Sequence, residues 1–309
     1  MSFVTASIFF FAAGEVFARL YSLNHRVYDI EMLHYANRLK VEYPDSTVGH
    51  FHKPNATAKL MGVTLATNSD GFRDKEYPLS KSQARRLIFL GDSLTLGWGV
   101  EEKDTFSTLL ENKLNQFSPT EIINFGVGNY NTEQEVHLFL DKGLQYHPDE
   151  VVVFYFINDA EEAKPENFKN IFRHSDLAAF YWSAVTRLSN RLRYEAYYHG
   201  LYREGDRKGW ARTQEAFLLL KQRCVENGIG LRVVLLPELH RLRDYPFKTE
   251  HQLVKDFLEK NHVACLDLAP FFYEKELASK LWVAKDDAHP NAVAHRLIAA
   301  ACEKFVSYD

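Results

Sequence analysis

The chain has 309 residues, of which 46% are hydrophobic, and a formal net charge of −4. This length and apolar content are enough for one large domain with a buried core and an additional segment. Basic and acidic residues are mixed without a broad basic field, which excludes nucleic acid as a partner. The three cysteines (Cys224, Cys265 and Cys302) have no CxxC spacing, so we expect neither a metal site nor a disulfide framework.

The first residues differ in composition from the rest of the chain. Residues 2–14, SFVTASIFFFAAG, carry no charge, and residues 15–23 add only Glu15 and Arg19. A membrane anchor, a signal peptide ending near AAG and a helix docked on the protein's own core are all compatible with this pattern. The uncharged run is short for a span, and basic residues are missing before it. We expect segment 1–23 to be a hydrophobic anchor or signal, with the protein in the cell envelope, membrane-anchored or exported.

Residues 24–84 are an irregular N-terminal extension. Turn-forming residues dominate YPDSTVGHFHKPNATAKL (43–60) and TNSDGFRDKEYP (67–78). The short apolar stretch MGVTLAT (61–67) predicts a small hairpin.

From residue 86 onward, expected strands and helices alternate. Asp104 is placed to cap the first of these helices. The expected strands are 86–91, 121–126, 149–159, 230–237 and 263–270, and the expected helices are 104–117, 132–144, 213–228, 251–262 and 291–306. This alternation predicts an α/β fold in which a parallel sheet of five strands is covered by helices on both faces. The carboxyl ends of the strands then meet along one edge.

The alternation lapses between residues 160 and 212. This insertion is dense in tyrosine, tryptophan and arginine. Two interpretations are open: a helical insertion that packs its aromatic side chains inward, or a lid that covers the active edge or binds an acyl group.

The first expected strand ends in Gly91, Asp92 and Ser93, and this triplet has two interpretations. In one, Gly91 and Asp92 form a turn and Ser93 caps the next helix. In the other, Ser93 is a nucleophile held at the carboxyl edge of the sheet, where open α/β folds place their ligands. The second interpretation requires a base and an oxyanion hole elsewhere in the chain.

Asp286 and His289 supply a candidate base, in the stretch AKDDAHPNAVAH after the last strand. A loop spacing of three residues can bring a carboxylate against an imidazole, which then accepts the proton of a serine. A lone DxxH pattern is weak evidence for a catalytic base, but this one is expected at the same sheet edge as Ser93.

Asn158 and the loop NFGVGNYNT (124–132) each follow an expected strand. Asn158 either satisfies backbone groups at the strand end or donates its amide N–H to an oxyanion. The glycines of the loop permit close approach to a ligand. Together with the N–H of Ser93, one loop N–H and the Asn158 amide make three candidate donors.

These motifs, in the order GDSL, glycine loop, ND and DxxHP, resemble the SGNH (GDSL) hydrolase superfamily over roughly residues 85–306. We therefore take 85–309 as one hydrolase domain. The resemblance implies a flavodoxin-like three-layer α/β/α sandwich with Ser93 as nucleophile, His289 as base and Asp286 as its orienting acid. It leaves Asp287 as a bystander and gives His295 a structural role.

The glycine loop departs from the pattern of the family. The family's NxGxxG block places a glycine where this chain has Asn129, and a glycine stands one position earlier, at Gly128. Either Asn129 or Gly128 is expected to supply the loop's oxyanion donor, and asparagine tolerates a left-handed backbone. The segments 43–60 and 68–78 also resemble the extension of a bacterial subgroup of membrane-anchored SGNH proteins.

The implied function is that of a serine esterase that forms an acyl-enzyme on Ser93 and needs no cofactor. Its expected substrates are a small acyl ester, a lipid or an acylated glycan. An alternative is an O-acyltransferase that passes the same acyl group to an envelope polysaccharide, with a membrane-bound O-acyltransferase as partner. A third, a non-catalytic SGNH-like binding module, is disfavoured by the joint presence of Ser93, Asp286, His289 and Asn158.

Overall fold

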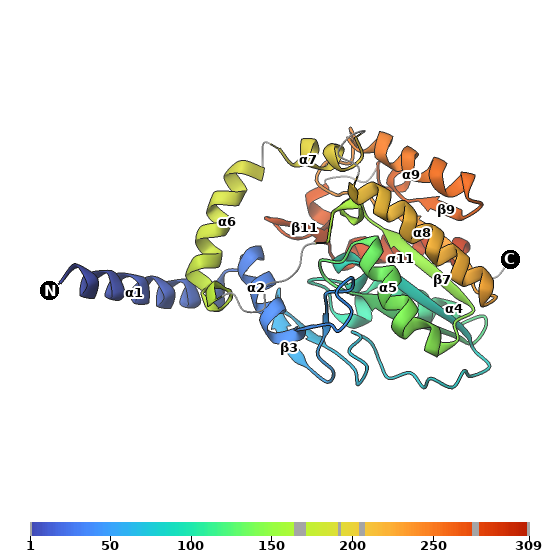
Figure 1. The fold of residues 1–309 in the computed structure, drawn as a ribbon, viewed down its shortest axis with the longest axis horizontal. Coiled ribbons are helices and arrows are strands. Elements are labelled where there is room, and N and C mark those ends of the chain that lie inside the picture. The colour runs from blue at the N-terminus through green and yellow to red at the C-terminus, as the bar shows by residue number, and fades with distance from the viewer. Residues whose placement is uncertain (1, 164–170, 191–192, 204–207, 274–277, 308–309) are drawn as a thin grey trace.

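A five-stranded, all-parallel sheet forms the centre of the protein in a computed structural model (Figure 1). The structure describes all residues except 1, 164–170, 191–192, 204–207, 274–277 and 308–309. The strand order is β6-β5-β7-β8-β9. These strands are β5 (Arg85–Gly91), β6 (Thr120–Gly126), β7 (Glu150–Tyr155), β8 (Gly230–Leu235) and β9 (Ala264–Asp267). The sheet predicted from the sequence is confirmed.

Helices cover both faces of the sheet. One face carries α4 (Phe106–Leu114) and α11 (Ala292–Val306), and the other carries α5 (Thr132–Lys142), α8 (Lys208–Glu226) and α9 (Lys248–Lys260). Alternate residues of β5 belong to the two cores: Leu87 and Phe89 pack toward α4, and Ile88 and Leu90 toward α5. This is the period of two expected for a strand buried on both faces. The three-layer α/β/α sandwich is therefore confirmed.

The chain before the sheet forms two helices and two antiparallel hairpins. They are α1 (Phe3–Asn24), α2 (Tyr28–Leu39), β1 (Lys40–Glu42) paired with β2 (His50–His52), and β3 (Thr57–Leu60) paired with β4 (Val63–Ala66). The β3–β4 turn at Met61 and Gly62, both at positive φ, confirms the hairpin predicted around residues 61–67.

The remaining elements are short or lie in the insertion. The helices are α3 (Ser93–Leu96), α6 (Asp176–Asn190), α7 (Tyr194–Leu201) and α10 (Ala269–Phe272), and the strands are β10 (Trp282–Ala284) and β11 (Asp287–Pro290). The 3-10 turns are η1 (Glu102–Asp104), η2 (Gly143–Tyr146), η3 (Ile157–Ala160), η4 (Ile171–His174) and η5 (Ala278–Leu281). Thr105, and not Asp104 as predicted, caps α4, because its side chain accepts the N–H of Thr108.

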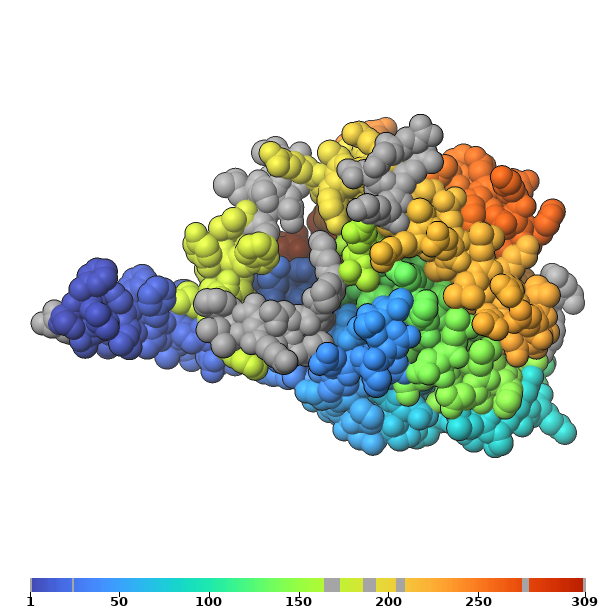
Figure 2. Space-filling model, in the orientation of Figure 1, coloured from blue at the N-terminus to red at the C-terminus, as the bar shows by residue number. Residues whose placement is uncertain are grey.

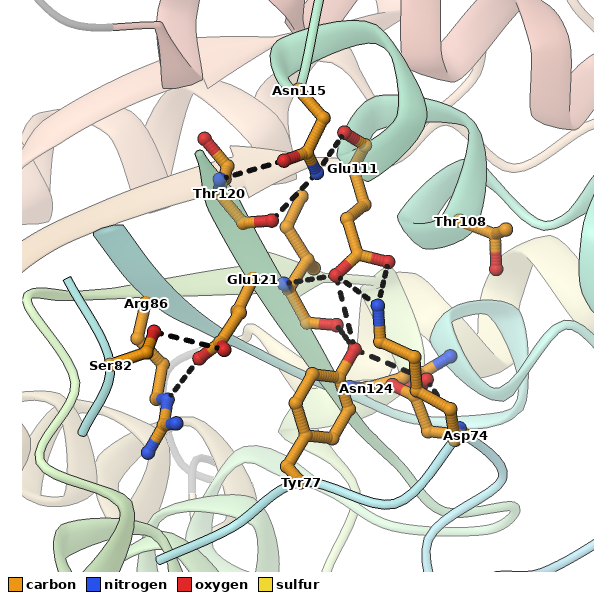
Figure 3. Close-up of polar contacts among 12 residues, drawn as sticks. Asp74, Tyr77, Ser82, Arg86, Thr108, Glu111, Asn115, Thr120, Glu121 and Asn124 are labelled. Carbon is orange, nitrogen blue, oxygen red and sulfur yellow. Dashed lines mark hydrogen bonds and ion pairs between the residues drawn. The ribbon is translucent and has the colours of Figure 1, made fainter. Parts of the chain in front are cut away.

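The outer edge of β6 is covered by side chains instead of another strand (Figure 3). Tyr77 donates its hydroxyl to the Ile122 carbonyl at 2.7 Å, and Asp74 accepts the Asn124 N–H at 2.8 Å. Glu111 of α4 accepts the Ile122 N–H at 3.1 Å. These contacts satisfy edge groups that would otherwise attract a foreign strand. Tyr77 and Asp74 therefore attach the extension to the outer edge of β6.

Helix α1 projects away from the body of the protein (Figure 1). Residues Phe3–Leu23 are long and apolar enough to cross a membrane, and 6% of the tested window is buried inside the structure. Such a helix fits a membrane anchor or a signal sequence, and its exposure argues against a helix docked on the protein's own core.

Candidate active site

Ser93 lies at the carboxyl end of β5, which is flanked by β6 and β7, in the first turn of α3. Its hydroxyl oxygen is 2.8 Å from Nε2 of His289. Asp92 caps α3 by accepting the N–H of Leu94 at 2.8 Å. The short helix packs directly on the end of β6, because a Cβ at Gly126 would lie 2.2 Å from the Leu96 nitrogen. This packing fixes the position of the serine relative to the sheet.

The carboxylate that contacts His289 belongs to Asp287, and this corrects the choice of Asp286. Oδ1 of Asp287 is 2.5 Å from Nδ1 of His289 and also accepts its backbone N–H at 3.0 Å. The segment is strand β11, in which residues two apart point to the same side. Asp286 precedes the strand and is exposed, whereas Asp287 is 4% exposed. The three-residue loop spacing assumed from the sequence does not apply to an extended segment.

The Asp287–His289 pair is electrostatically coupled. Burial favours the neutral form of both groups, but the charge of each partner and the hydrogen bond between them lower the pKa of Asp287 and raise that of His289. Trp98 donates its indole N–H to the second oxygen of Asp287 at 2.9 Å. The carboxylate is thus held in the ionised form that can orient and stabilise an imidazolium.

The candidate oxyanion donors lie at the ends of three adjacent strands, β6, β5 and β7. Asn129 follows β6 in a left-handed conformation with φ of 70°. Within the described residues, no acceptor receives its backbone N–H. The N–H of Gly128 is instead donated to the hydroxyl of Tyr35 at 2.9 Å. Of the two residues expected for this donor, Gly128 thus has its N–H engaged, whereas the N–H of Asn129 has no acceptor among the described residues.

The extension holds this loop through a chain of hydrogen bonds. The Tyr35 hydroxyl contacts Nε2 of His52 at 2.6 Å, and Nδ1 of His52 faces the carbonyl of Gly71 at 3.1 Å. His52 therefore donates through Nδ1 and accepts the Tyr35 proton at Nε2. On the other side, His50 donates to the Gly128 carbonyl at 3.1 Å. Burial lowers the pKa of His50 and of His52 to about 3, so both rings are neutral at physiological pH.

Asn158 lies in η3 directly after β7 and is half-buried. Three buried carboxyl groups, Asp92, Glu135 and Asp159, lie in the same region. Burial raises the pKa of each, and the mutual repulsion of the three contributes for Glu135 and Asp159. In the described part of the chain, neither side-chain oxygen of Glu135 has a hydrogen-bond partner. The shift toward the neutral form limits negative charge in this region.

Three aromatic side chains surround the imidazole and the helix that carries the serine. The ring of Tyr28, from α2, stacks on His289 with centroids 5.7 Å apart, and Trp98 lies 6.3 Å from the same ring. Tyr35 packs against Trp98 at 5.6 Å. The sequence analysis did not identify these residues, and no local pattern marks Tyr28 or Tyr35. Asp287 follows from the sequence only once the segment is known to be extended, and that depends on the pairing of β11 with β10.

Two further residues support the site without touching its reacting atoms. Arg73 is 1% exposed and donates to the carbonyls of Leu96, Gly97 and Val100, at 2.9, 2.6 and 2.5 Å. His295 is fully buried and accepts the N–H of Phe106 at 3.0 Å. Burial lowers its pKa to about 3, which suits the structural role expected for it.

Comparison with known proteins gives one family and a set of solved structures. The family described as GDSL-like lipase/acylhydrolase matches residues 89–297. A mutant of the acetylxylan esterase Axe2 from Geobacillus stearothermophilus is 16% identical, with a TM-score of 0.48 over 74% of this chain and 98% of that one. The psychrotrophic esterase EstA from Pseudoalteromonas sp. is 15% identical, with a TM-score of 0.46 over 71% and 95%. The acetyl xylan esterase AlAXEase is 17% identical, with a TM-score of 0.46 over 72% and 99%. No curated protein sequence matches the chain.

Proposed function

The chain belongs to the GDSL-like lipase/acylhydrolase family of ester-hydrolysing enzymes, and from this premise we propose that it is a serine esterase with Ser93, His289 and Asp287 as its triad. The observation that carries the proposal is the 2.8 Å contact between the Ser93 hydroxyl and Nε2 of His289. Since His289 is held by a buried carboxylate on its other nitrogen, its Nε2 is the basic atom that faces the serine.

In the proposed reaction, the Ser93 oxygen attacks the carbonyl carbon of an ester while His289 accepts the serine proton. The tetrahedral intermediate collapses as the bond to the alcohol oxygen breaks, and His289 returns the proton to the departing alcohol. Water then attacks the acyl-enzyme with the same base, which releases the acid and restores Ser93. Asp287 orients the imidazole and stabilises its positive charge in both steps.

We assign the oxyanion hole to the backbone N–H of Ser93, the backbone N–H of Asn129 and the side-chain amide of Asn158. Their positions at three adjacent strand ends and the unengaged N–H of Asn129 support this assignment. Loss of one such donor costs about 10²–10³ in kcat. Asn158→Ala is therefore expected to lose that much, whereas Asn129→Gly, which keeps the backbone donor, retains most activity.

The same acyl-enzyme serves a second candidate function, transfer of the acyl group to a sugar hydroxyl of an envelope glycan. The exposed apolar helix α1 favours this candidate, since it would hold the enzyme at a membrane of the cell envelope, where a membrane-bound O-acyltransferase could supply acyl groups. A panel of p-nitrophenyl esters from acetate to long chains, with and without glycan acceptors, separates the two. Acceptor-dependent formation of acylated glycan indicates the transferase, and turnover with water alone indicates the esterase.

Two adjacent aspartates provide a matched test of the triad. Asp287→Asn is expected to lower kcat by about 10⁴-fold, as the loss of the orienting acid does in serine hydrolases. Asp286→Asn changes a neighbouring exposed carboxylate to the same amide and is expected to leave kcat unchanged.

An alkyl phosphonate should label the unmodified protein at Ser93. It should label neither the Ser93→Ala variant nor the His289→Ala variant. Labelling at another residue, or equal effects of the two aspartate substitutions, contradicts the proposed site.

A further inference from the structure

We propose that helix α6 lies on the surface of a lipid bilayer, with Tyr181, Trp182 and Val185 in the headgroup region. The proposal rests on α1 being a membrane anchor and goes beyond it, because it assigns a lipid-contacting role to part of the insertion. It also fixes the level at which α1 leaves the bilayer.

Helices α1 and α6 cross and are joined at the start of α6 (Figure 1). Gly14 faces α6 closely, since a Cβ there would lie 2.9 Å from the Leu177 side chain. The carboxylate of Glu15 accepts the backbone N–H groups of Asp176 and Leu177, both at 3.1 Å, and the Ser175 hydroxyl at 2.8 Å. Nearly two turns further along α1, Tyr21 packs edge-on against Phe180 with centroids 5.6 Å apart. Glu15 therefore attaches the N-terminus of α6 to α1 at a defined position along the axis of α1.

This junction is too polar for the hydrocarbon interior of a bilayer. Glu15 forms an ion pair with Arg19 at 2.7 Å, and the side chain of Arg19 is 61% exposed. Charged side chains in the bilayer core are costly unless they reach the interface. The boundary of the hydrocarbon thus falls near Gly14. Residues 3–14, on the hydrocarbon side of this boundary, rise about 18 Å along the helix, so this part of α1 enters a hydrocarbon core of about 30 Å without crossing it. The phenylalanines among these residues are exposed, Phe3 by 87% and Phe9 by 71%.

The outward face of α6 has the composition of an interfacial helix. Tyr181 is 70% exposed, Trp182 63% and Val185 47%. Val185 is four residues from Tyr181 and three from Trp182, so the three side chains lie on one face, and Asp176 and Ser183 are buried on the other side. Tyrosine and tryptophan concentrate at membrane–water interfaces, where one end of the ring system is apolar and the other is wet. Because the start of α6 is joined to α1, whose apolar side chains are exposed, the occupant that fits this face is the lipid surface.

The position of α6 brings the active edge close to this surface. On its inner side α6 contacts α2, where His34 bonds Asp176 at 2.9 Å, and Tyr28 of α2 stacks on His289. Figure 2 shows a hollow between α6 and the body of the protein, with α2 and the C-terminal segment at its floor. An ester carried by a membrane lipid or by a glycan attached to the membrane is therefore the substrate that this geometry favours.

Tryptophan fluorescence in vesicles tests the placement. The chain has four tryptophans, and Trp98 and Trp210 are each 1% exposed in the protein core. Full-length protein is reconstituted into phosphatidylcholine vesicles brominated either near the headgroup (carbons 6 and 7) or deep in the acyl chain (carbons 11 and 12). We expect headgroup-proximal bromine to quench more strongly than deep bromine. Trp182→Phe should lose most of this quenching, whereas the control Trp282→Phe should retain it.

Three results overturn the proposal. Equal quenching of the unmodified protein and Trp182→Phe means that α6 does not contact lipid and faces a protein or solvent. Stronger quenching by the deep bromine means that α6 is inserted rather than on the surface. Failure of the protein to float with vesicles contradicts the anchor itself. All three readouts are independent of phosphonate labelling at Ser93, so failure of this inference and failure of the proposed reaction are distinguishable.

Discussion

The N-terminal extension (24–84) and the first part of the insertion both lie near the active edge, but their polar and aromatic groups are used in different ways. The extension directs buried side chains into the backbone of the catalytic loops: Arg73 binds three carbonyls after α3, and Tyr35 accepts the N–H of Gly128. Helix α6 of the insertion instead turns Tyr181 and Trp182 outward. The extension is thus a structural part of the catalytic domain, whereas α6 presents a surface to something outside it.

The largest effect expected from this difference concerns two arginines. Arg73→Met should lower the free energy of unfolding by about 3 kcal/mol or more, because three buried carbonyls lose a charged donor. Arg212→Met in the insertion removes an exposed 3.3 Å pair with Glu133 and should cost less than about 1 kcal/mol. Chemical denaturation in detergent measures both. Similar losses for the two variants would contradict the structural distinction between the two regions.

A smaller effect is expected at the hydroxyl of Tyr35. Tyr35→Phe leaves the Gly128 N–H and Nε2 of His52 without partners, at a cost of about 1–3 kcal/mol. Since the loop also carries Asn129, kcat should fall while KM stays nearly constant, the pattern for loss of a group that acts in the transition state. Tyr181→Phe removes an exposed hydroxyl from α6 and is the matched control, with neither kinetic constant changed in soluble-ester assays. A rise in KM for Tyr35→Phe would assign the tyrosine to substrate binding.

The sheet and the contact between Ser93 and His289 were predictable because their signals are local. Apolar runs with polar ends marked the strands, and the motifs around Ser93 and His289 fell at strand ends. Asp286 was expected at the imidazole, where the structure has Asp287, because the choice between adjacent aspartates depends on whether the segment is a loop or a strand. That choice was set by pairing of β11 with β10, which a single sequence does not display.

The support from the extension was not predictable for a different reason. Tyr35 and Gly128 are 93 positions apart, and their contact depends on tertiary packing. The insertion shows the same limit: its aromatics include both the buried Tyr202 and Trp210 and the exposed Tyr181 and Trp182. Aromatic composition alone does not distinguish side chains that are buried from side chains that are exposed. Hence the inward packing of aromatic side chains describes Tyr202 and Trp210 but not Tyr181 and Trp182, and the lid over the active edge stays a prediction.

The attachment of the extension to β6 is expected to depend on pH through Asp74. Burial raises the pKa of this carboxyl to about 7 from an ordinary value of 3.8, so its contribution to stability is present at low pH and is lost as the pH rises toward 7. Asp74→Asn should remove this term. Between pH 5 and 8, the variant should gain up to about 2–3 kcal/mol relative to the unmodified protein. Comparing the two proteins at each pH cancels the titration of His50 and His52, and parallel pH profiles would contradict the prediction.

The smallest effect is expected on the outer face of α6 in the absence of lipid. Val185→Ser replaces a side chain that is 47% exposed, and exposed substitutions away from caps and cores usually change stability by no more than about 0.5 kcal/mol. We therefore expect Val185→Ser to unfold like the unmodified protein in denaturation experiments in detergent. The matched change inside the extension, Val48→Ser, removes a fully buried side chain and should cost several times as much. A large loss for Val185→Ser would mean that the outer face of α6 packs against the protein itself, and the distinction between the extension and α6 would then fail.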